Sequence, residues 1–164
     1  MSKISINQNQ VDNIDLLIAQ RFFYSRAKKI RGIRIVTSIL IALISPIALF
    51  YFKSYLVIIG AIGGIWALVA YIIKNLLENS NIEKGAKIQE NFDTSVFEIS
   101  WNAVLAGEKV PYEDINYAKT KFKGNIDKLK DWYSDVSDFP SPLDILLCQR
   151  SNLVWDWRLK RIYA

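Results

Sequence analysis

The chain has 164 residues, enough for one modest domain, and 21 Lys and Arg against 16 Asp and Glu give it a net charge of +5. It contains no histidine, so the most adaptable general base and metal ligand is missing, and its single cysteine, Cys148, excludes an internal disulfide. Glycine-rich phosphate loops, a nucleophile elbow and histidine-containing metal motifs are also absent. We therefore expect a protein that is not an enzyme and that has no cofactor and no metal site.

The first 34 residues predict a basic amphipathic helix. Residues 1–10 are polar and are expected to be loose, whereas from Val11 apolar residues recur at helical spacing without a break into the apolar run that follows. Six cations lie between residues 21 and 34 with no acid among them. They are Arg21, Arg26, Lys28, Lys29, Arg31 and Arg34. Such a block directly before a span holds its flank in the cytoplasm and suits anionic headgroups, and we prefer this to the alternative of binding a nucleic acid polymer.

Two uncharged runs, residues 35–52 and 55–73, have 18 and 19 residues and are separated only by Lys53-Ser54. As helices they would be roughly 27 to 29 Å long, and the hydrocarbon core of a bilayer is about 30 Å thick. The alternatives are two core helices of a soluble protein, which so small a domain could hardly cover, and a signal peptide, which would be shorter and would end at a small-residue cleavage site. We predict a transmembrane hairpin whose two ends lie on the cytoplasmic side of the membrane.

Small residues in the second run indicate a helix-packing face. Gly60 and Gly64 form a G-x-x-x-G pair, which lets another helix backbone approach closely. Packing inside the hairpin is the favoured interpretation. The alternative is association between subunits, which would make the protein a homo-oligomer in the lipid bilayer.

Residues 74–164 predict a cytoplasmic helical region and complete an all-α fold. The second run is expected to continue as a helix through residue 92, and residues 92–101 are expected to form a connector. Apolar residues at helical steps predict a further helix from Pro111 to Tyr133, and Ser141-Pro142 followed by Asp144 predicts a capped helix that runs to about Tyr163.

The last predicted helix carries the most site-like group of residues in the chain. Gln149, Asn152 and Asp156 are spaced to lie on one helical face, and Arg150 and Trp155 are close to them in the sequence. The favoured interpretation is a buried polar network that joins the cytoplasmic helices. The functional alternative is an anion or nucleotide site, in which the guanidinium binds phosphate and the indole stacks nearby.

Several strings together resemble one protein family. The strings are Leu16-Leu-Ile-Ala-Gln-Arg-Phe-Phe-Tyr-Ser25, Ile88-Gln-Glu-Asn-Phe-Asp-Thr94, Trp101-Asn102, Asp131-Trp-Tyr133 and Cys148-Gln-Arg-Ser-Asn-Leu-Val-Trp-Asp156. In this order they resemble the SMODS-associating four-transmembrane effectors, and the resemblance covers nearly the whole chain.

This resemblance implies a role in bacterial anti-phage signalling. In such systems a nucleotidyltransferase makes a cyclic nucleotide, and the effector then forms pores or otherwise disrupts the inner membrane. Members of the family have two spans before and two after the cytoplasmic region, so we expect these 164 residues to be the first half of a four-span protein. The alternative function is a membrane anchor or scaffold that recruits a cytoplasmic partner without forming a pore.

Overall fold

The computed structural model describes residues 2–163, with side chains at all of them except 53, 156, 159, 160, 162 and 163, and it is helical with no strand among these residues. This confirms the predicted all-α class. The chain divides into two compact units. We call Gln20–Ala86 the hairpin unit, and Met1–Ala19 together with Lys87–Ala164 the helical unit. The predicted divisions were 1–34, 35–73 and 74–164.

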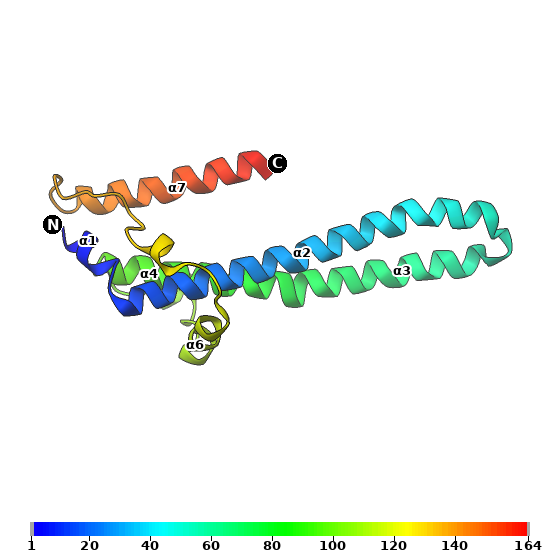
Figure 1. Ribbon diagram of the computed structural model, residues 1–164, viewed down its shortest axis with the longest axis horizontal. Coiled ribbons are helices and arrows are strands. Elements are labelled where there is room, and N and C mark those ends of the chain that lie inside the picture. The colour runs from blue at the N-terminus through cyan, green and yellow to red at the C-terminus, as the bar shows by residue number, and fades with distance from the viewer. Residues whose placement is uncertain (1, 164) are drawn as a thin grey trace. The chain divides into compact units, whose positions relative to one another are not determined.

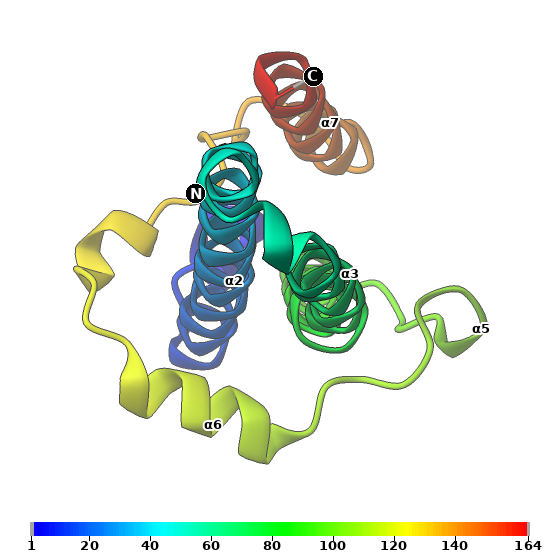
Figure 2. The same cartoon turned by 90° about the vertical axis from the view of Figure 1, so that its right-hand side faces the viewer.

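Two long helices form the hairpin unit and lie side by side in antiparallel directions (Figures 1 and 2). The first is α2, Val11–Tyr51, whose start belongs to the helical unit. A 3₁₀ turn at Lys53–Tyr55 leads into α3, Leu56–Ile72, which continues through a π-helical segment, Ile73–Glu78, into α4, Asn79–Val96. Both predicted apolar runs are therefore helical.

The apolar parts of both helices leave their side chains uncovered. Within the most apolar stretch of each long helix, none of the residues is buried. Leu43, Val57 and Leu68, for example, are 62%, 81% and 61% exposed. A continuous apolar surface of this kind is unfavourable in water, whereas the acyl chains of a bilayer cover it at no such cost. The two helices are long and apolar enough to cross a membrane.

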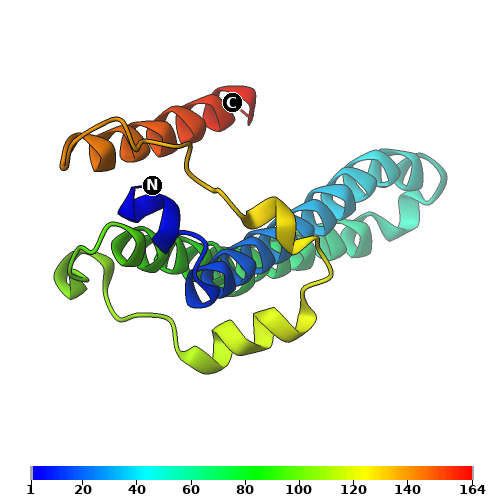
Figure 3. The same cartoon turned by 60° about the vertical axis from the view of Figure 1, so that its left-hand side comes forward.

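The helical unit packs shorter elements around the start of α2 and the end of α4 (Figure 3). These elements are α1, Lys3–Asn7; α5, Ala103–Ala106; α6, Tyr112–Lys121; the 3₁₀ turn Ile126–Leu129; and α7, Leu143–Tyr163. The core of the unit contains Leu17, Ile88, Phe92, Leu129 and Tyr133, each at most 3% exposed. The predicted final helix is confirmed almost residue for residue.

The prediction that residues 1–10 are loose is wrong. Ser2 caps α1 by accepting a hydrogen bond from the backbone N–H of Ser5, and Ile4 is only 3% exposed. The side chain of Gln8 then binds both backbone groups of Tyr133, accepting from its N–H at 2.7 Å and donating to its carbonyl at 3.3 Å. A polar segment is thus ordered because a distant loop satisfies its side chains.

Two further predicted boundaries are wrong. Residues 73–96 are helical without a break, so residues 92–96 belong to α4 and not to a connector. The helix expected over 111–133 ends at Lys121, and Phe122 is extended. The ring of Phe122 lies where a side chain at Gly124 would be, so a larger residue at this position would displace the ring.

Candidate functional site

A pocket of about 500 Å³ lies in the helical unit. It is formed by the first turns of α2, the last turns of α4 and the segment from Ile99 to Ile115. Its lining residues are Asp12, Asn13, Asp15, Leu16, Asn91, Thr94, Ser95, Ile99, Trp101, Lys109, Tyr112 and Ile115. A volume of this size is typical of small-molecule sites, which combine an apolar floor with a few polar groups.

Aromatic and cationic groups lie together on one side of this pocket. The indole of Trp101 is held by a 3.0 Å hydrogen bond from its Nε1 to the carbonyl of Gly107. The ammonium of Lys109 lies 5.3 Å from the centre of the same ring, in cation–π contact. Tyr112, the first residue of α6, adds a second aromatic side chain that is 72% exposed. The arrangement can stack a flat ring and place a cation beside it.

Carboxylate, amide and hydroxyl groups line the rest of the pocket. Asp15 on α2 forms an ion pair with Lys119 on α6, which connects the two helices. Asp12 and Asn13 come from α2, and Thr94 comes from α4. Because acidic and basic groups are both present, the pocket is suited to a ligand that has hydrogen-bond donors as well as a negative charge.

A second polar cluster in the helical unit joins α4 to α7. The hydroxyl of Tyr133 donates to Oδ1 of Asp93 at 2.6 Å. The amide of Asn152 donates to Oδ2 of Asp93 at 3.2 Å and to the hydroxyl of Tyr133 at 2.8 Å. All three side chains therefore satisfy one another, and Asn152 is the polar link between α7 and the rest of the unit.

Burial shifts the acid–base properties of this cluster. Desolvation raises the pKa of Asp93 to about 6, with a further upward contribution from Glu90, although the hydrogen bond from Tyr133 acts in the opposite direction. Burial also raises the pKa of Tyr133, and the nearby negative charge of Asp93 raises it further. Phe92 stacks on the Tyr133 ring at a centroid distance of 6.1 Å, which helps to exclude water.

The residues predicted as a ligand site on the last helix differ in exposure. Gln149, Arg150 and Trp155 are exposed on α7, whereas Asn152 is partly buried and belongs to the cluster with Asp93. The side chain of Asp156 lies outside the described residues. None of the five lines the 500 Å³ pocket. The predicted polar network is thus present at Asn152, but its partners come from α4 and from the loop before α7.

The pocket and the cluster escaped the sequence analysis, yet a signal for both was present. The strings that carry the family resemblance include Asp93, Thr94, Trp101, Tyr133 and Asn152. The fold brings Asp93, Tyr133 and Asn152 together in the cluster. It places Thr94 and Trp101 in the wall of the pocket. Their grouping in one unit could have been inferred from those strings, but not their contacts.

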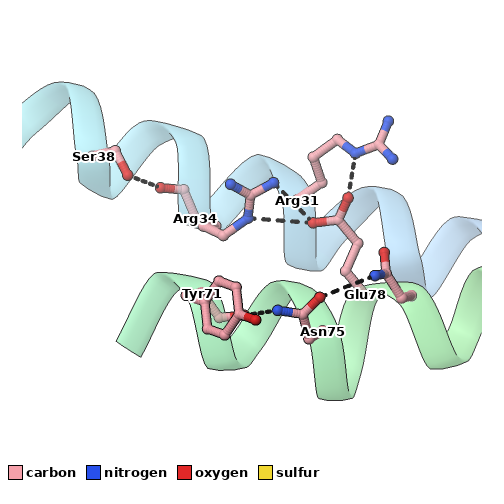
Figure 4. A network of polar contacts seen from close by, with 7 residues as sticks. Arg31, Arg34, Ser38, Tyr71, Asn75 and Glu78 are labelled. Carbon is pink, nitrogen blue, oxygen red and sulfur yellow. Dashed lines mark hydrogen bonds and ion pairs between the residues drawn. The ribbon is translucent and has the colours of Figure 1, made fainter. Parts of the chain in front are cut away.

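A third cluster lies in the hairpin unit, just beyond the apolar runs (Figure 4). The carboxylate of Glu78, whose side chain is 3% exposed, accepts from Nε of Arg31 at 2.6 Å and from Nη2 of Arg34 at 3.0 Å. Burial disfavours the charge of Glu78, but the two guanidinium groups outweigh it and the pKa of Glu78 is lowered. A buried carboxylate is stable here because both of its oxygens are paired.

Gly60 and Gly64 are exposed on α3, and a Cβ added at either glycine would meet no atom of another helix within 4 Å. That these two glycines form a helix-packing face, within the hairpin or between subunits, stays a prediction. Their face is open to another helix.

Comparison with known proteins assigns the family. The family model of the SMODS-associating 4TM effector domain matches residues 2–164 of this chain. The chain belongs to that family. The match includes both units, so the hairpin, the pocket and the clusters described above are all parts of one SMODS-associating 4TM effector domain.

A curated relative comes from Bacillus cereus (strain VD146) and is described as a probable CBASS effector molecule. It is 43% identical over 164 aligned positions, which cover 96% of this chain and 55% of the relative. The chain therefore spans about half the length of the relative that it matches. No solved structure is significantly similar to the chain. Among the described residues of this 4TM effector domain, no three His, Cys, Asp or Glu are grouped so that they could hold a metal ion.

Proposed function

We propose that this chain is the membrane-anchored part of an anti-phage effector that responds to a cyclic nucleotide by forming pores in, or otherwise disrupting, the bacterial inner membrane. The observation that carries the proposal is the hairpin, whose apolar helices leave their surfaces open to lipid in a chain of the 4TM effector family. The Bacillus cereus relative, a probable CBASS effector molecule, supports the same role. The effector would act as a homo-oligomer and not as an enzyme.

Charge supports a cytoplasmic position for both ends of this segment. Five of the six cations before the first span, Arg21, Arg26, Lys28, Lys29 and Arg31, are exposed. Such a cluster is retained on the cytoplasmic side of a membrane. The helical unit would then lie in the cytosol, where a cyclic nucleotide is made.

The 500 Å³ pocket is the site that we propose for the nucleotide. Trp101 would stack on a base, as aromatic side chains do in nucleic-acid-binding proteins, and Lys109 would contact a phosphate. Asp12 would accept, and Asn91 would accept and donate, hydrogen bonds at the edge of the base. The exposed Gln149, Arg150 and Trp155 on α7 provide the alternative ligand surface.

Equilibrium binding of labelled cyclic di- and trinucleotides to the full-length protein in nanodiscs distinguishes these two surfaces. If the pocket binds the ligand, Trp101→Ala weakens binding by about 1 to 3 kcal/mol, the usual contribution of one stacked base. Trp157→Ala is the matched control, because Trp157 is an exposed tryptophan that does not line the pocket. If Arg150→Gln abolishes binding while Trp101→Ala has no effect, the α7 surface is the site instead.

Membrane potential tests the effector function itself. Cells that express the full-length protein with its nucleotidyltransferase should depolarise when the nucleotide is made, and cells with a catalytically dead nucleotidyltransferase should not. Absence of depolarisation when the nucleotide is present and bound would contradict the proposal.

One observation favours a second function, that of a scaffold. Val104 and Leu105 on α5 are 94% and 85% exposed, so two apolar side chains project from the helical unit. A partner protein that packs on them would be recruited to the membrane. Capture of one partner in a fixed ratio to the effector, lost in Leu105→Asp and without any change in membrane potential, would favour this function.

A further inference from the structure

The face of α3 that packs in the hairpin follows a regular spacing. The partly buried residues between Leu56 and Ile73 are separated by steps of four, three, four and three. They are Ile59, Gly63, Trp66, Ala70 and Ile73. This is the spacing of a helix that packs along a partner through a narrow seam. One hydrogen bond crosses the seam, from Nε1 of Trp66 to Oγ of Ser38 on α2, at 3.0 Å.

The spacing changes by one residue at the π-helical segment. After Ile73 the next partly buried residue is Asn75, whereas the first fully buried residue is Glu78, five positions after Ile73 and so one more than an α-helical step of four, and steps of three and four continue at Asn81 and Gly85. The backbone accounts for the extra residue, since Ile73–Glu78 is π-helical and the N–H of Asn79 donates to the carbonyl of Lys74. In an uninterrupted α-helix the next seam residue would be Leu77.

The two sides of this π-bulge are held with unequal strength. Beyond it, Glu78 is fixed by Arg31 and Arg34 (Figure 4). Gly85 lies so close to Tyr24 that an added Cβ would be 3.1 Å from its ring. Before it, a hydrogen bond from Trp66 to Ser38 joins α3 to α2. If the bulge relaxes to an α-helix, α3 is therefore the side that turns.

The sequence of α3 allows a second seam one residue further on. A shift of one residue turns the helix by about 100° and brings a set of mostly small side chains toward α2. They are Gly60, Gly64, Ala67, Tyr71 and Lys74. The glycines would let the helices approach closely, and Lys74 would lie one turn from Glu78, which it can pair with as an i, i+4 neighbour.

We infer that the Ile73–Glu78 π-bulge is a register switch, in which α3 turns by one residue on α2 about the fixed Glu78 and thereby exposes or hides the Gly60–Gly64 face. In the register described here the glycines are open to a second helix and Trp66 is in the seam. In the second register the glycines face α2 and Trp66 faces lipid. π-Bulges have weaker hydrogen-bond geometry than an α-helix and often occur at functional sites. Both properties are consistent with a one-residue shift at the Ile73–Glu78 bulge. This inference concerns the hairpin alone and does not depend on the nucleotide or the pore.

Pairs of cysteines in the full-length protein report the two registers. Cys148→Ser gives the background, and Ile41→Cys supplies the α2 partner, one turn beyond Ser38 on the partly buried side. Gly63→Cys reports the register described here, and Gly64→Cys reports the second. Ile65→Cys is the matched control, because it faces away from α2 and is 63% exposed. Oxidation of native membranes should cross-link Ile41→Cys with both glycine positions well above the Ile65 control.

Deletion of Asn75 should lock the switch. The deletion removes the extra residue, so that Trp66 and Glu78 share one uninterrupted α-helical seam. We expect the yield of the Gly64 pair relative to the Gly63 pair to fall by about tenfold. Conversely, Ser38→Ala with the bulge intact should raise that ratio, because it removes the hydrogen bond that holds Trp66 in the seam.

The inference is overturned if, in the protein that retains Asn75, the cross-linking yield of the Gly64 pair never exceeds that of the Ile65 control. It is also overturned if deletion of Asn75 leaves the ratio of the Gly64 yield to the Gly63 yield unchanged. If the deletion variant does not insert in the membrane, the Ser38→Ala measurement decides. An unchanged ratio in that variant also overturns the inference.

Discussion

The hydroxyl of Tyr133 donates a 2.6 Å hydrogen bond to Oδ1 of Asp93, and through it the loop before α7 is joined to α4. The same hydroxyl accepts from Asn152 at 2.8 Å, so it is both donor and acceptor within one buried cluster. Such a group cannot be removed without leaving partners unsatisfied.

Replacement of the tyrosine tests this connection. Tyr133→Phe keeps the ring packed on Phe92 but leaves one oxygen of the buried Asp93 without its donor, which should lower the free energy of unfolding by about 1 to 3 kcal/mol. Chemical denaturation of the detergent-solubilised protein measures the change. Tyr112→Phe is the control, because Tyr112 is 72% exposed and should change stability little. Equal stabilities of the two variants would show that the hydrogen bond contributes nothing.

Asp93 should make the stability of the helical unit depend on pH. Its folded pKa of about 6 lies above the ordinary value of 3.8, so between these values the folded chain binds more protons than the unfolded chain. The contribution of the protonated carboxyl is complete below pH 3.8 and is lost as the pH rises to 6, a change on the order of 3 kcal/mol.

Melting temperatures measured from pH 4 to pH 7 check this sign. Asp93→Asn should flatten the fall in stability over that interval, because it removes the titrating group and keeps the shape of the side chain. Asp138→Asn, an exposed acid, provides the comparison. A fall that persists in full in Asp93→Asn would assign the pH dependence to other groups.

The hairpin and the last helix could be predicted from the sequence because each depends on local pattern. Two uncharged runs of span length and a capped start at Ser141-Pro142 are sufficient signals, and α2, α3 and α7 follow them. The helical stripe after Pro111 was a misleading signal, since apolar residues there are spaced as in a helix but the chain turns at Gly124. Tyr133 is buried by Phe92 and by Gln8 from the distant N-terminus. The spacing of apolar residues along the sequence does not reveal these contacts.

The candidate site depended still more on distant contacts. Asn152 was recognised as part of a polar face, but its partners, Asp93 and Tyr133, are 59 and 19 residues away in the sequence. The pocket combines residues from α2, α4 and α6, none of which forms a motif alone. The π-bulge was equally hidden, because the sequence of α3 allows two seams and only a distant contact, the hydrogen bond from Trp66 to Ser38 on α2, reveals which one is used.

Cys148 should be almost unreactive while the protein is folded. It is 2% exposed, and burial raises its pKa to about 11, with smaller contributions from the charges of Asp144 and Asp93. Since the thiolate is the reactive form, alkylation at pH 8 should be about a hundredfold slower than after unfolding. Mass spectrometry after a timed pulse of iodoacetamide measures the rate. Ser151→Cys on a Cys148→Ser background should react quickly, because residue 151 is exposed on the same helix; rapid labelling of native Cys148 would contradict the burial.

Two glycines of the hairpin unit should respond in opposite ways to the same substitution. A Cβ at Gly85 would lie 3.1 to 3.2 Å from the ring of Tyr24, whereas a Cβ at Gly64 would meet no atom of another helix. Alanine favours the helix equally at both sites, so the difference between Gly85→Ala and Gly64→Ala isolates the crowding, for which we expect about 1 to 3 kcal/mol. Denaturation of the monomeric protein in detergent measures it, because any helix packed on Gly64 from a second copy is then absent. Equal stabilities would mean that the Tyr24 ring moves aside without cost, and Gly85 would no longer be evidence that the segment beyond the π-bulge is fixed against α2.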